Sequence, residues 1–502
     1  MVSLRISAGS CSHEAGRGPT EQSDTNRQNK AETLKLGKGA LRSLFHNTPN
    51  RIALTVQHTQ RPDLTHNRRI AVIGAGIAGL SAAWLLSRQH EVTLYEREAR
   101  LGGHANTVNV ETPAGRLAVD TGFIVYNEAN YPNFVAMLDH LNVPSVSTHM
   151  SFAASVGEGQ FEYSSDLRGL VGQKRNLARP GYWQMLTDIM RFYGHAESLL
   201  DSPEIEGMTL GEFLSLHGYS EDLVDLHVLP MCAAIWSSSA EAIRGFPMQA
   251  FVRFFSSHEL FKVGRRRLWR TVKGGSRSYV AALMHDFGDR VTVAQEARSV
   301  HRQGGLVTIE DVNGNRDVFT DVVIATHADQ ALRLLDNPDA DERQVLGAFS
   351  YTANRAVLHD DVTLMPKRRH VWASWNYIGA ARGSDDHALC VTYWMNRLQN
   401  LDRRHPVFVT LNPHREPRSQ SIMRTFDYEH PLFNQQALSA QNDLWKLQGR
   451  HGTWFCGSYF GYGFHEDALQ SGLAVAERFG VTRPWQAPAG RIAAPPMLLA
   501  AE

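Results

Sequence analysis

Apolar runs of strand length recur along the chain from about residue 69, and helical patterns separate them. The run Ile70-Ala71-Val72-Ile73 is continuously apolar, which is typical of a strand buried on both faces of a parallel sheet. Leu80, Ala83 and Leu86 then repeat at a helical spacing, and residues 91–95 form a second strand-like run. The order strand, helix, strand predicts a parallel α/β unit.

Strand-like runs return in the second half of the chain. They are predicted at residues 290–293, 306–309, 321–325, 389–394 and 453–457. A helical pattern begins at about Glu466, and residues 130–270 alternate helical patterns with aromatic-rich stretches. The chain is therefore predicted to be an α/β protein whose strands come from dispersed segments.

The two ends of the chain show no sustained hydrophobic period. Residues 1–67 are rich in Ser, Thr, Asn, Gln and charge, which predicts a disordered extension. A targeting peptide is the alternative there, and the acidic residues of the segment disfavour it. Residues 483–502 are rich in Pro and Ala, which predicts a flexible tail.

Composition excludes several classes of protein. A chain of 502 residues favours two interleaved domains over a single core. Lys and Arg total 51, as do Asp and Glu, so the charge gives no bias toward nucleic acid. No apolar run approaches the roughly 20 residues that span a bilayer, so work on a lipid would have to proceed from one side of a membrane.

The cysteines and histidines give no sign of a disulfide framework or a metal site. Cys11, Cys232, Cys390 and Cys456 lie far apart without paired spacing, which fits a reducing cytoplasm. The histidines are scattered without metal-ligand spacing. We therefore expect no metal.

A glycine motif follows the first strand and opens the helix. In Gly74-Ala75-Gly76-Ile77-Ala78-Gly79, the first glycine permits a tight turn and the second lets backbone approach a pyrophosphate. The third lets the helix pack closely on the strand, and the helix N-terminus offers N–H groups to phosphates. Glu96 closes the next strand, where a carboxylate can bind ribose hydroxyls. This context predicts a dinucleotide site.

A second glycine pair favours FAD over NAD. Arg100-Leu101-Gly102-Gly103-His104 comes just after the ribose acid. Two glycines there let backbone lie against the far half of an extended dinucleotide, as a flavin requires.

These motifs resemble the flavin-containing amine oxidoreductase superfamily, which includes monoamine oxidases, protoporphyrinogen oxidase and phytoene desaturases. The match begins with residues 69–107. Val119-Asp120-Thr121-Gly122-Phe123 resembles the segment whose backbone passes the isoalloxazine ring, and residues 455–472 resemble the C-terminal FAD motif. The resemblance covers residues 69–482. It implies an α/β fold in which a Rossmann-like FAD-binding domain, similar to amine oxidase and glutathione reductase, is interleaved with an α+β substrate domain.

The resemblance also implies domain limits and a set of FAD-binding residues. The FAD-binding domain would comprise residues 68–130, 270–330 and 450–482, and the substrate domain residues 131–269 and 331–449. Noncovalent FAD would be bound by Gly74, Gly76, Ala78, Gly79, Glu96, Arg97, Gly102, Gly103, His104, Thr121, Gly122, Phe123, Val293, Gly457, Glu466, Asp467 and Ala468. Among these, Val293 would supply backbone contacts to the adenine side, and the backbone amides near Asp467 and Ala468 would face the flavin pyrimidine edge.

Two departures from the amine oxidases turn attention to another substrate. Those enzymes carry a lysine at the position matched to Asp321, and a tyrosine of the substrate cage at the position matched to Phe464. An oxidised amine is well served by an aromatic cage and a basic group that holds a water. Loss of the lysine and the phenol therefore weakens the amine hypothesis.

Finer motifs resemble a bacterial branch of the superfamily that is similar to the N-terminal domain of plant cyclopropane fatty acid synthases. They lie at residues 121–127, 269–276 and 462–467. Members of that branch are associated with cyclopropane synthase-like methyltransferases, and some desaturate methylated acyl chains. The resemblance implies a lipid acyl chain that loses a hydride to flavin N5, and such a methyltransferase as partner.

Residues outside the motifs leave alternatives open. An apolar tunnel and ordinary core packing both fit the aromatic residues Trp236, Phe251, Phe254, Phe255, Phe261, Trp269, Trp372, Trp375 and Trp394. Arg265-Arg266-Arg267 fits either peripheral contact with an anionic inner membrane or a solvated surface. His465 is a candidate proton acceptor or a structural residue, and Phe464 is its neighbour at the flavin edge.

Three hypotheses follow for the whole chain. The leading one is a cytoplasmic FAD-dependent desaturase or oxidase of a lipid acyl chain. The second is an amine or polyamine oxidase of the same fold. The third is a flavin-bound partner that supports a methyltransferase without turnover.

Overall fold

The computed structural model describes residues 67–113, 115–236, 238–262, 268–380 and 390–486. All of the described residues belong to one compact unit, Pro62–Glu502. Residues 1–66 of the predicted disordered extension and the triplet Arg265-Arg266-Arg267 lie outside the described residues.

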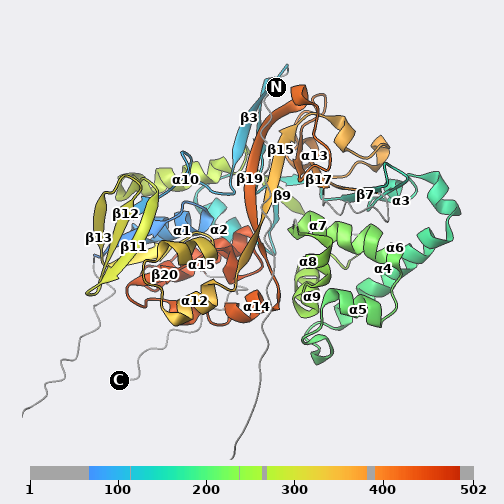
Figure 1. Cartoon of the computed structure of the whole chain (residues 1–502). Helices are drawn as coiled ribbons and strands as arrows, with labels where there is room; N and C mark the ends of the chain where they lie inside the picture. Colours follow the sequence, from blue (N-terminus) through green and yellow to red (C-terminus); the bar gives the residue numbers. More distant parts are fainter. Residues whose placement is uncertain (1–66, 114, 237, 263–267, 381–389, 487–502) are drawn as a thin grey trace, which may run out of the picture. The chain divides into compact units, whose positions relative to one another are not determined.

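A five-stranded parallel sheet carries the dinucleotide motif (Figure 1). Its order is β10 (Val291–Ala294), β2 (Glu91–Tyr95), β1 (Arg69–Ile73), β14 (Asp321–Ile324) and β20 (Thr453–Phe455). The strands are short and mostly buried, because helices cover both faces of a parallel sheet. The predicted Rossmann-like α/β fold is confirmed.

Helix α1 (Ile77–Leu86) is buried along its whole length. Its contact with α15 (His465–Glu477) is very close, since a Cβ on Gly472 would lie 2.2 Å from the Ala78 carbonyl oxygen. Helix α10 (Arg277–Phe287) also packs on α1. Helices α1 and α15, which are far apart in the sequence, are thus fixed against each other.

A seven-stranded sheet forms the second part of the structure. Its order is β19 (Ile422–Leu432), β15 (Ser350–His359), β18 (Phe408–Leu411), β17 (Cys390–Trp394), β16 (Trp375–Gly379), β7 (Phe152–Val156) and β8 (Phe161–Ser164). All neighbours are antiparallel except β16 and β7. Every strand falls within the segments that the sequence assigned to the substrate domain.

A helical layer packs on this sheet through a shared hydrophobic core (Figure 1). It contains α4 (Pro180–Ser198), α5 (Leu210–Leu216), α6 (Glu221–Leu223), a π-helical turn (Val224–Val228), α7 (Leu229–Trp236), α8 (Ala240–Arg244) and α9 (Met248–Ser257). The core is rich in aromatic rings, many of them from residues 130–270.

Smaller elements complete the described chain. One short sheet contains β11 (Ala297–Gln303), β12 (Leu306–Asp311) and β13 (Arg316–Phe319). A second pairs β3 (Thr107–Thr112) with β4 (Gly115–Asp120). A third has the order β5 (Tyr126–Asn127), β9 (Trp269–Val272) and β6 (Ser145–Thr148). The remaining helices are α2 (Pro132–His140), α3 (Leu167–Leu170), α11 (Ala328–Leu334), α12 (Ala340–Leu346), α13 (Met395–Leu398) and α14 (Gln435–Gln441).

Packing continues beyond the predicted end of the ordered chain. Arg483 donates to Asn133 Oδ1 at 2.7 Å and is ion-paired with Glu477 at 2.6 Å. The ring of Trp485 stacks on Trp84, with 5.8 Å between centroids. A flexible tail that begins at residue 483 is therefore wrong for the first residues of that segment, because Trp485 covers an indole on α1.

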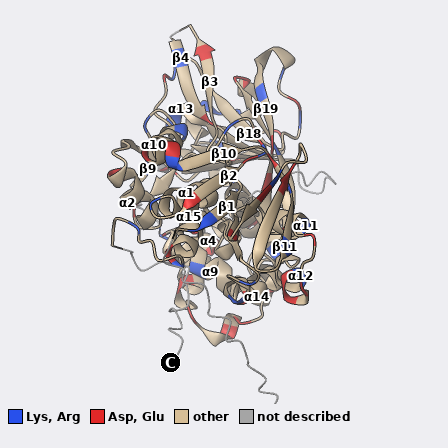
Figure 2. Ribbon diagram, turned by 90° about the vertical axis from the view of Figure 1, so that its left-hand side faces the viewer, with Lys and Arg blue, Asp and Glu red and all other residues tan. Residues whose placement is uncertain are grey.

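The surface agrees with the balanced composition. Basic and acidic positions are interspersed over the elements visible in Figure 2. Within the described ranges, no helix combines the length and the apolar character needed to cross a bilayer.

Candidate active site

A cavity of about 730 Å³ opens at the carboxyl ends of the parallel strands. Ile73 at the end of β1, Tyr95 at the end of β2 and Ala325 just after β14 line it there. It extends to Tyr193 of α4 and Trp236 of α7 in the helical layer. The carboxyl ends of parallel strands are where α/β folds bind their ligands.

The first glycine motif forms a backbone cradle in this cavity. Gly74 has φ +99° and its amide donates to the Tyr95 carbonyl at 2.8 Å. A Cβ on Gly79 would lie 1.8 Å from the Gly74 oxygen, so only glycine permits this approach of helix and turn. A Cβ on Gly76 would meet nothing within 4 Å, and Gly76 lines the cavity. The space beside Gly76 is therefore open to a ligand.

The second glycine pair lies directly against the first motif. The Gly102 amide donates to the Ala75 carbonyl at 2.8 Å, and a Cβ on Gly103 would lie 3.0 Å from the Gly76 Cα. Glu96 Oε2 accepts a hydrogen bond from the Ala75 amide at 2.7 Å. Two motifs separated in sequence thus form one cradle with a carboxylate at its edge.

The segment expected beside the flavin ring continues from this cradle. The Phe123 amide donates to the His104 carbonyl at 2.8 Å, and a Cβ on Gly122 would lie 2.2 Å from that oxygen. The Thr121 hydroxyl is hydrogen-bonded to the Tyr428 hydroxyl at 2.8 Å. Backbone contact with His104 therefore holds this segment along the cavity wall.

His465 lies in an aromatic sandwich at the N-terminus of α15. Its ring stacks on Phe123 with centroids 3.9 Å apart and planes 7° apart, and its Nε2 is hydrogen-bonded to the Tyr279 hydroxyl at 2.7 Å. Burial lowers the pKa of His465 to about 3. A histidine with this pKa stays neutral and is a weak base, so the geometry fits a residue that positions Phe123 and does not favour His465 as proton acceptor.

The side chains of Glu466 and Asp467 serve the protein backbone. Glu466 accepts from the Asn133 and Phe134 amides, both at 2.9 Å, and so caps helix α2. Asp467 accepts from the Phe464 amide at 3.0 Å. The Ala468 amide donates to the Phe464 carbonyl at 3.1 Å, which makes it the first bond of α15. The outward-facing amides of this helix end are those before Ala468, which shifts the expected donors toward the N-terminus by one residue.

The burial of Glu466 gives a pH dependence of stability. Burial raises its pKa from 4.5 to about 7. A raised carboxyl pKa means that the folded state holds the proton more tightly, so stability is greatest below pH 4.5 and falls as pH rises to 7, by on the order of 3 kcal/mol. Urea unfolding at several pH values should show this fall in the wild type and a flatter profile in Glu466→Gln. A variant with the wild-type slope would contradict the assignment.

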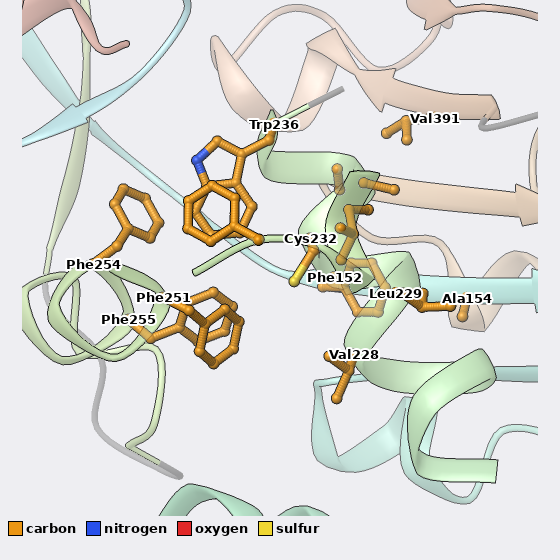
Figure 3. Close-up of a cluster of buried hydrophobic side chains, with 14 of the residues drawn as sticks. Phe152, Ala154, Val228, Leu229, Cys232, Trp236, Phe251, Phe254, Phe255 and Val391 are labelled. Atoms are coloured by element: carbon orange, nitrogen blue, oxygen red, sulfur yellow. The ribbon is translucent and has the colours of Figure 1, made fainter. Parts of the chain in front are cut away.

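Apolar side chains surround the far part of the cavity, which we call the apolar arm. They come from the helical layer, the seven-stranded sheet, β9 and nearby loops. The arm is lined by Phe152, Tyr193, His227, Met231, Ala234, Ile235, Trp236, Phe254, His258, Leu260, Trp269, Trp375, Tyr393 and Leu411. Figure 3 shows Trp236 of α7 beside the phenylalanine rings of α9. The ring centroids of Trp236 and Phe254 are 5.0 Å apart. Phe464 stacks on Phe254 at 4.9 Å.

A family model for flavin containing amine oxidoreductases matches residues 77–479, most of the chain. The chain belongs to this family. A Mycobacterium tuberculosis protein named as the flavin-containing monoamine oxidase AofH is 25% identical over 291 residues, which are 55% of this chain and 61% of that protein. The chain thus spans about three fifths of the length of that curated relative.

Solved structures agree on the fold. A fatty acid isomerase from P. acnes that produces CLA has a TM-score of 0.60 at 17% identity, and the match covers 82% of this chain and 99% of that one. Cyclohexylamine oxidase from Brevibacterium oxydans has a TM-score of 0.59 at 12% identity, over 82% and 98% of the two chains. At these identities the likeness shows the fold of this flavin-containing amine oxidoreductase.

The residues present fit the FAD that the family implies. The open space at Gly76, the close backbone of Gly103 and the carboxylate of Glu96 suit pyrophosphate and ribose. The cavity then continues past Phe123, as a flavin ring requires. The chain is an FAD-dependent oxidoreductase, and noncovalent binding is typical of its family. Cys232, Cys390 and Cys456 are buried.

The cavity brings together most of the residues predicted to bind FAD. Those that line it are Gly74, Gly76, Ala78, Glu96, Arg97, Gly103, His104, Thr121, Gly122, Phe123, Gly457 and Ala468, with the catalytic candidates Phe464 and His465. Gly79, Gly102, Glu466 and Asp467 support the wall from behind. Val293, expected to offer its backbone to the adenine side, is 48% exposed on the edge strand β10 and does not line the cavity, whereas Glu296, Ala297 and Arg298 just after that strand do.

Several cavity histidines were not singled out from the sequence. His227, His258, His327 and His430 come from separate segments, so no local spacing marks them. Burial lowers the pKa of His430 to about 4 and, together with the nearby charge of His430, holds the pKa of His104 well below its usual range. Both rings are neutral: His430 Nδ1 is hydrogen-bonded to the Asn354 amide at 3.0 Å, and the His104 ring packs against Tyr428 and His430.

Asp321 lies at the end of its strand that is remote from the cavity. It therefore does not correspond to the lysine that amine oxidases place near the flavin. It begins β14, whereas the cavity lies at the carboxyl end of that strand. Its carboxylate is ion-paired with Arg68 at 2.6 Å and accepts from Trp454 Nε1 at 3.2 Å. The residue at this position therefore carries no information on the substrate, and only Phe464 remains of the two departures.

Removing the charge of Asp321 should destabilise the fold and spare the active site. Arg68 and Asp321 are 8% and 3% exposed, so Asp321→Asn removes one charge of a buried ion pair, at a cost of about 3–5 kcal/mol. Denaturant unfolding should show this loss, with unchanged FAD affinity in the folded fraction. Glu111→Gln, which breaks the exposed pair with Arg116, should cost less than about 1 kcal/mol. Equal losses in the two variants would contradict the structural role.

Proposed function

We propose that this flavin-containing amine oxidoreductase removes two hydrogens from a long acyl chain of a lipid. The observation that carries the proposal is the chemistry of the apolar arm. None of the described residues that line the arm is Asp, Glu, Lys or Arg. The charged side chains of the cavity, Glu96, Arg97, Glu296, Arg298, Arg333 and Glu429, belong to loops, helices and strands at its dinucleotide part.

An uncharged arm suits a hydrocarbon better than an ammonium group. An alkylammonium ion taken out of water needs a counter-ion or several hydrogen-bond acceptors. A methylene chain gains about 0.8 kcal/mol for each buried CH₂. A fatty acid isomerase shares the fold, which supports the view that this architecture can hold an acyl chain.

The flavin and the protein divide the work of the proposed reaction. FAD, when bound, supplies the acceptor for a hydride. The protein orients the chain between the Phe464–Phe254 stack and the Phe123–His465 stack. His258 is the nearest histidine of the arm to Phe464, with centroids 5.8 Å apart. Its Nδ1 is 2.9 Å from the Phe254 carbonyl and so donates to it, which leaves Nε2 to accept the proton that the chain loses together with the hydride.

A methyltransferase of the cyclopropane synthase type, implied by the sequence resemblance, is the partner under this proposal. Its class of reaction would provide the methylated chain that the oxidoreductase consumes.

An amine oxidase is the second candidate. Trp269, Trp375 and Tyr393 line the arm and offer ring faces to a cation. The AofH relative, named as a monoamine oxidase, adds to this alternative.

Flavin reduction separates the two candidates. The oxidised holoprotein is mixed anaerobically with methylated unsaturated phospholipid and, in a second cell, with polyamines. The flavin absorbance should bleach with the phospholipid. Bleaching by polyamines alone would replace the proposal by the amine alternative, and no bleaching by either would support a partner without turnover.

A further inference from the structure

A chain of side-chain hydrogen bonds ends at His430 in the cavity wall. The Asn354 amide group donates to His430 Nδ1 at 3.0 Å, and the Asn412 amide group donates to Asn354 Oδ1 at 2.7 Å. The chain begins at the backbone N–H of Arg355, which donates to Asn412 Oδ1 at 2.9 Å. His430 and Asn354 lie on the paired strands β19 and β15, and Asn412 directly follows β18.

The backbone N–H sets the direction of every bond in this chain. It can only donate, so it holds Asn412 Oδ1 toward Arg355 and leaves the Asn412 amide group for Asn354. Asn354 Oδ1 accepts that bond. The amide hydrogens of Asn354 then go to the Thr352 carbonyl at 3.0 Å and to His430. His430 Nδ1 must therefore accept, and the proton of the neutral ring lies on Nε2.

The backbone of Asn412 helps to hold this orientation. Its φ is +48°, in the left-handed region that asparagine tolerates better than most residues. Its own N–H donates to the Arg355 carbonyl at 2.8 Å. The start of the hydrogen-bond chain is thus fixed by two backbone groups of one residue.

Nε2 of His430 is a donor that is open to the cavity. His430 lines the cavity, and none of the described residues accepts a hydrogen bond from this nitrogen. Nε2 of the neighbouring His104 is enclosed by protein, whereas Nε2 of His430 is not. Burial lowers the pKa of His430 to about 4, so the ring is neutral at neutral pH. The arrangement leaves one N–H group for a ligand in the cavity.

The surroundings of His430 indicate which ligand accepts from it. Its ring centroid lies 5.5 Å from that of His104, which directly follows the second glycine pair. Tyr428 lies two residues earlier on β19, and so on the same face, and its hydroxyl is hydrogen-bonded to that of Thr121 at 2.8 Å. His430 thus lies where the two segments that were predicted to flank the flavin half of FAD come together.

We propose that His430 Nε2 donates a hydrogen bond to an acceptor oxygen of FAD and so helps to retain the cofactor. The inference concerns the cofactor and holds for either candidate substrate. A donor of fixed direction suits a group that only accepts, and FAD offers phosphate oxygens and flavin carbonyls of this kind. The ester carbonyl of a lipid is the competing acceptor, and the test separates it from FAD.

Release of FAD from the holoprotein tests the inference. The holoprotein is diluted into buffer without FAD or lipid, and the fluorescence of the released flavin is followed with time. His430→Phe keeps a ring and removes the donor, so FAD release should be about tenfold faster than from the wild type. His430→Gln returns an amide donor near the position of Nε2 and should stay within about threefold of the wild type.

His359→Phe is the matched control. His359 also lies in the seven-stranded sheet, and burial lowers its pKa to about 4. Its Nδ1 accepts from the Asp361 amide at 3.1 Å, and its Nε2 is hydrogen-bonded to the Thr410 hydroxyl at 2.7 Å. His359 does not line the cavity. The substitution should lower the temperature of thermal unfolding and leave the rate of FAD release unchanged.

Asn412→Gly tests whether the direction of the chain matters. Glycine keeps the left-handed backbone and removes the amide group. Asn354 can then turn its oxygen toward His430, and the ring proton can move to Nδ1. FAD release should become about threefold faster, although Asn412 does not line the cavity. This effect is not expected if His430 acts only by its shape.

Three results would overturn the inference. The first is FAD release from His430→Phe at the wild-type rate. The second is a His430→Gln variant that releases FAD as fast as His430→Phe, because the shape of the ring would then retain the cofactor. The third is unchanged FAD release from His430→Phe together with tenfold weaker binding of methyl oleate, which would assign the donor to the lipid. Thermal unfolding of each variant establishes that it is folded.

Discussion

Replacing Gly76 by alanine should weaken FAD binding by roughly 100-fold, or about 2.7 kcal/mol, and leave the fold intact. A Cβ at this position meets no protein atom within 4 Å, so the folded backbone tolerates it. The space that it enters is the open side of the cradle, where a pyrophosphate has to lie against backbone N–H groups. Equilibrium dialysis of FAD and the flavin content of the purified variant measure the effect.

Gly194→Ala is the matched control for this substitution. Gly194 also has open space around its would-be Cβ, and it lies within helix α4, away from the cavity lining. Alanine should stabilise that helix by about 0.5–1 kcal/mol and leave FAD affinity unchanged. A Gly76→Ala variant that binds FAD as tightly as Gly194→Ala would show that the cradle does not hold the dinucleotide.

Met231→Glu should abolish reduction by an acyl substrate, with a loss of about 100-fold or more in kcat/KM. Met231 lines the apolar arm, so the variant brings a carboxylate into a wall that has no charge to balance it. The FAD cradle is formed by other segments, and flavin content should stay the same. Anaerobic stopped-flow reduction of the flavin measures the effect.

A second methionine provides the comparison. Met190 is 57% exposed on α4, and Met190→Glu should retain wild-type reduction. An acyl substrate that reduces Met231→Glu at the wild-type rate would show that the chain does not occupy the arm.

Local sequence patterns were sufficient to predict the dinucleotide-binding part of the molecule. The apolar run of β1 predicts the strand. The spacing of Gly74, Gly76 and Gly79 predicts the turn that follows, because a side chain at any of these positions would clash with the backbone or with the bound dinucleotide. The pair Gly102-Gly103 correctly favoured FAD over NAD, and Gly103 lines the cavity beside Gly76. These features are encoded within about 30 residues, which is the span of a βαβ unit.

Features set by pairing between distant segments could not be predicted in this way. Val293 was expected to offer backbone contacts on the adenine side, and it lies on the edge strand β10, outside the residues that line the cavity. Asp321 was compared with a lysine near the flavin, although it lies at the amino end of β14. The rule that ligands bind at carboxyl ends of parallel strands could have excluded that comparison.

The apolar arm is the part for which sequence alone was least informative. Trp236 and Phe254 line the cavity, but Phe251 and Phe255 pack behind them in the core. A helix presents side chains to two neighbours at once, and only the packing of α7 against α9 decides which ring meets the cavity. His227 is hydrogen-bonded to Tyr163 and Tyr193, which come from other segments, so no local pattern marks it.

The central claim is that the enzyme dehydrogenates an acyl chain, and analysis of the product of one anaerobic turnover tests it most directly. The oxidised holoprotein is mixed with excess methylated unsaturated lipid, and the acyl chains are examined by mass spectrometry. The expected product lacks two hydrogens and is formed in an amount equal to the flavin reduced. Acyl chains recovered with unchanged mass, while polyamines reduce the flavin, would contradict the claim.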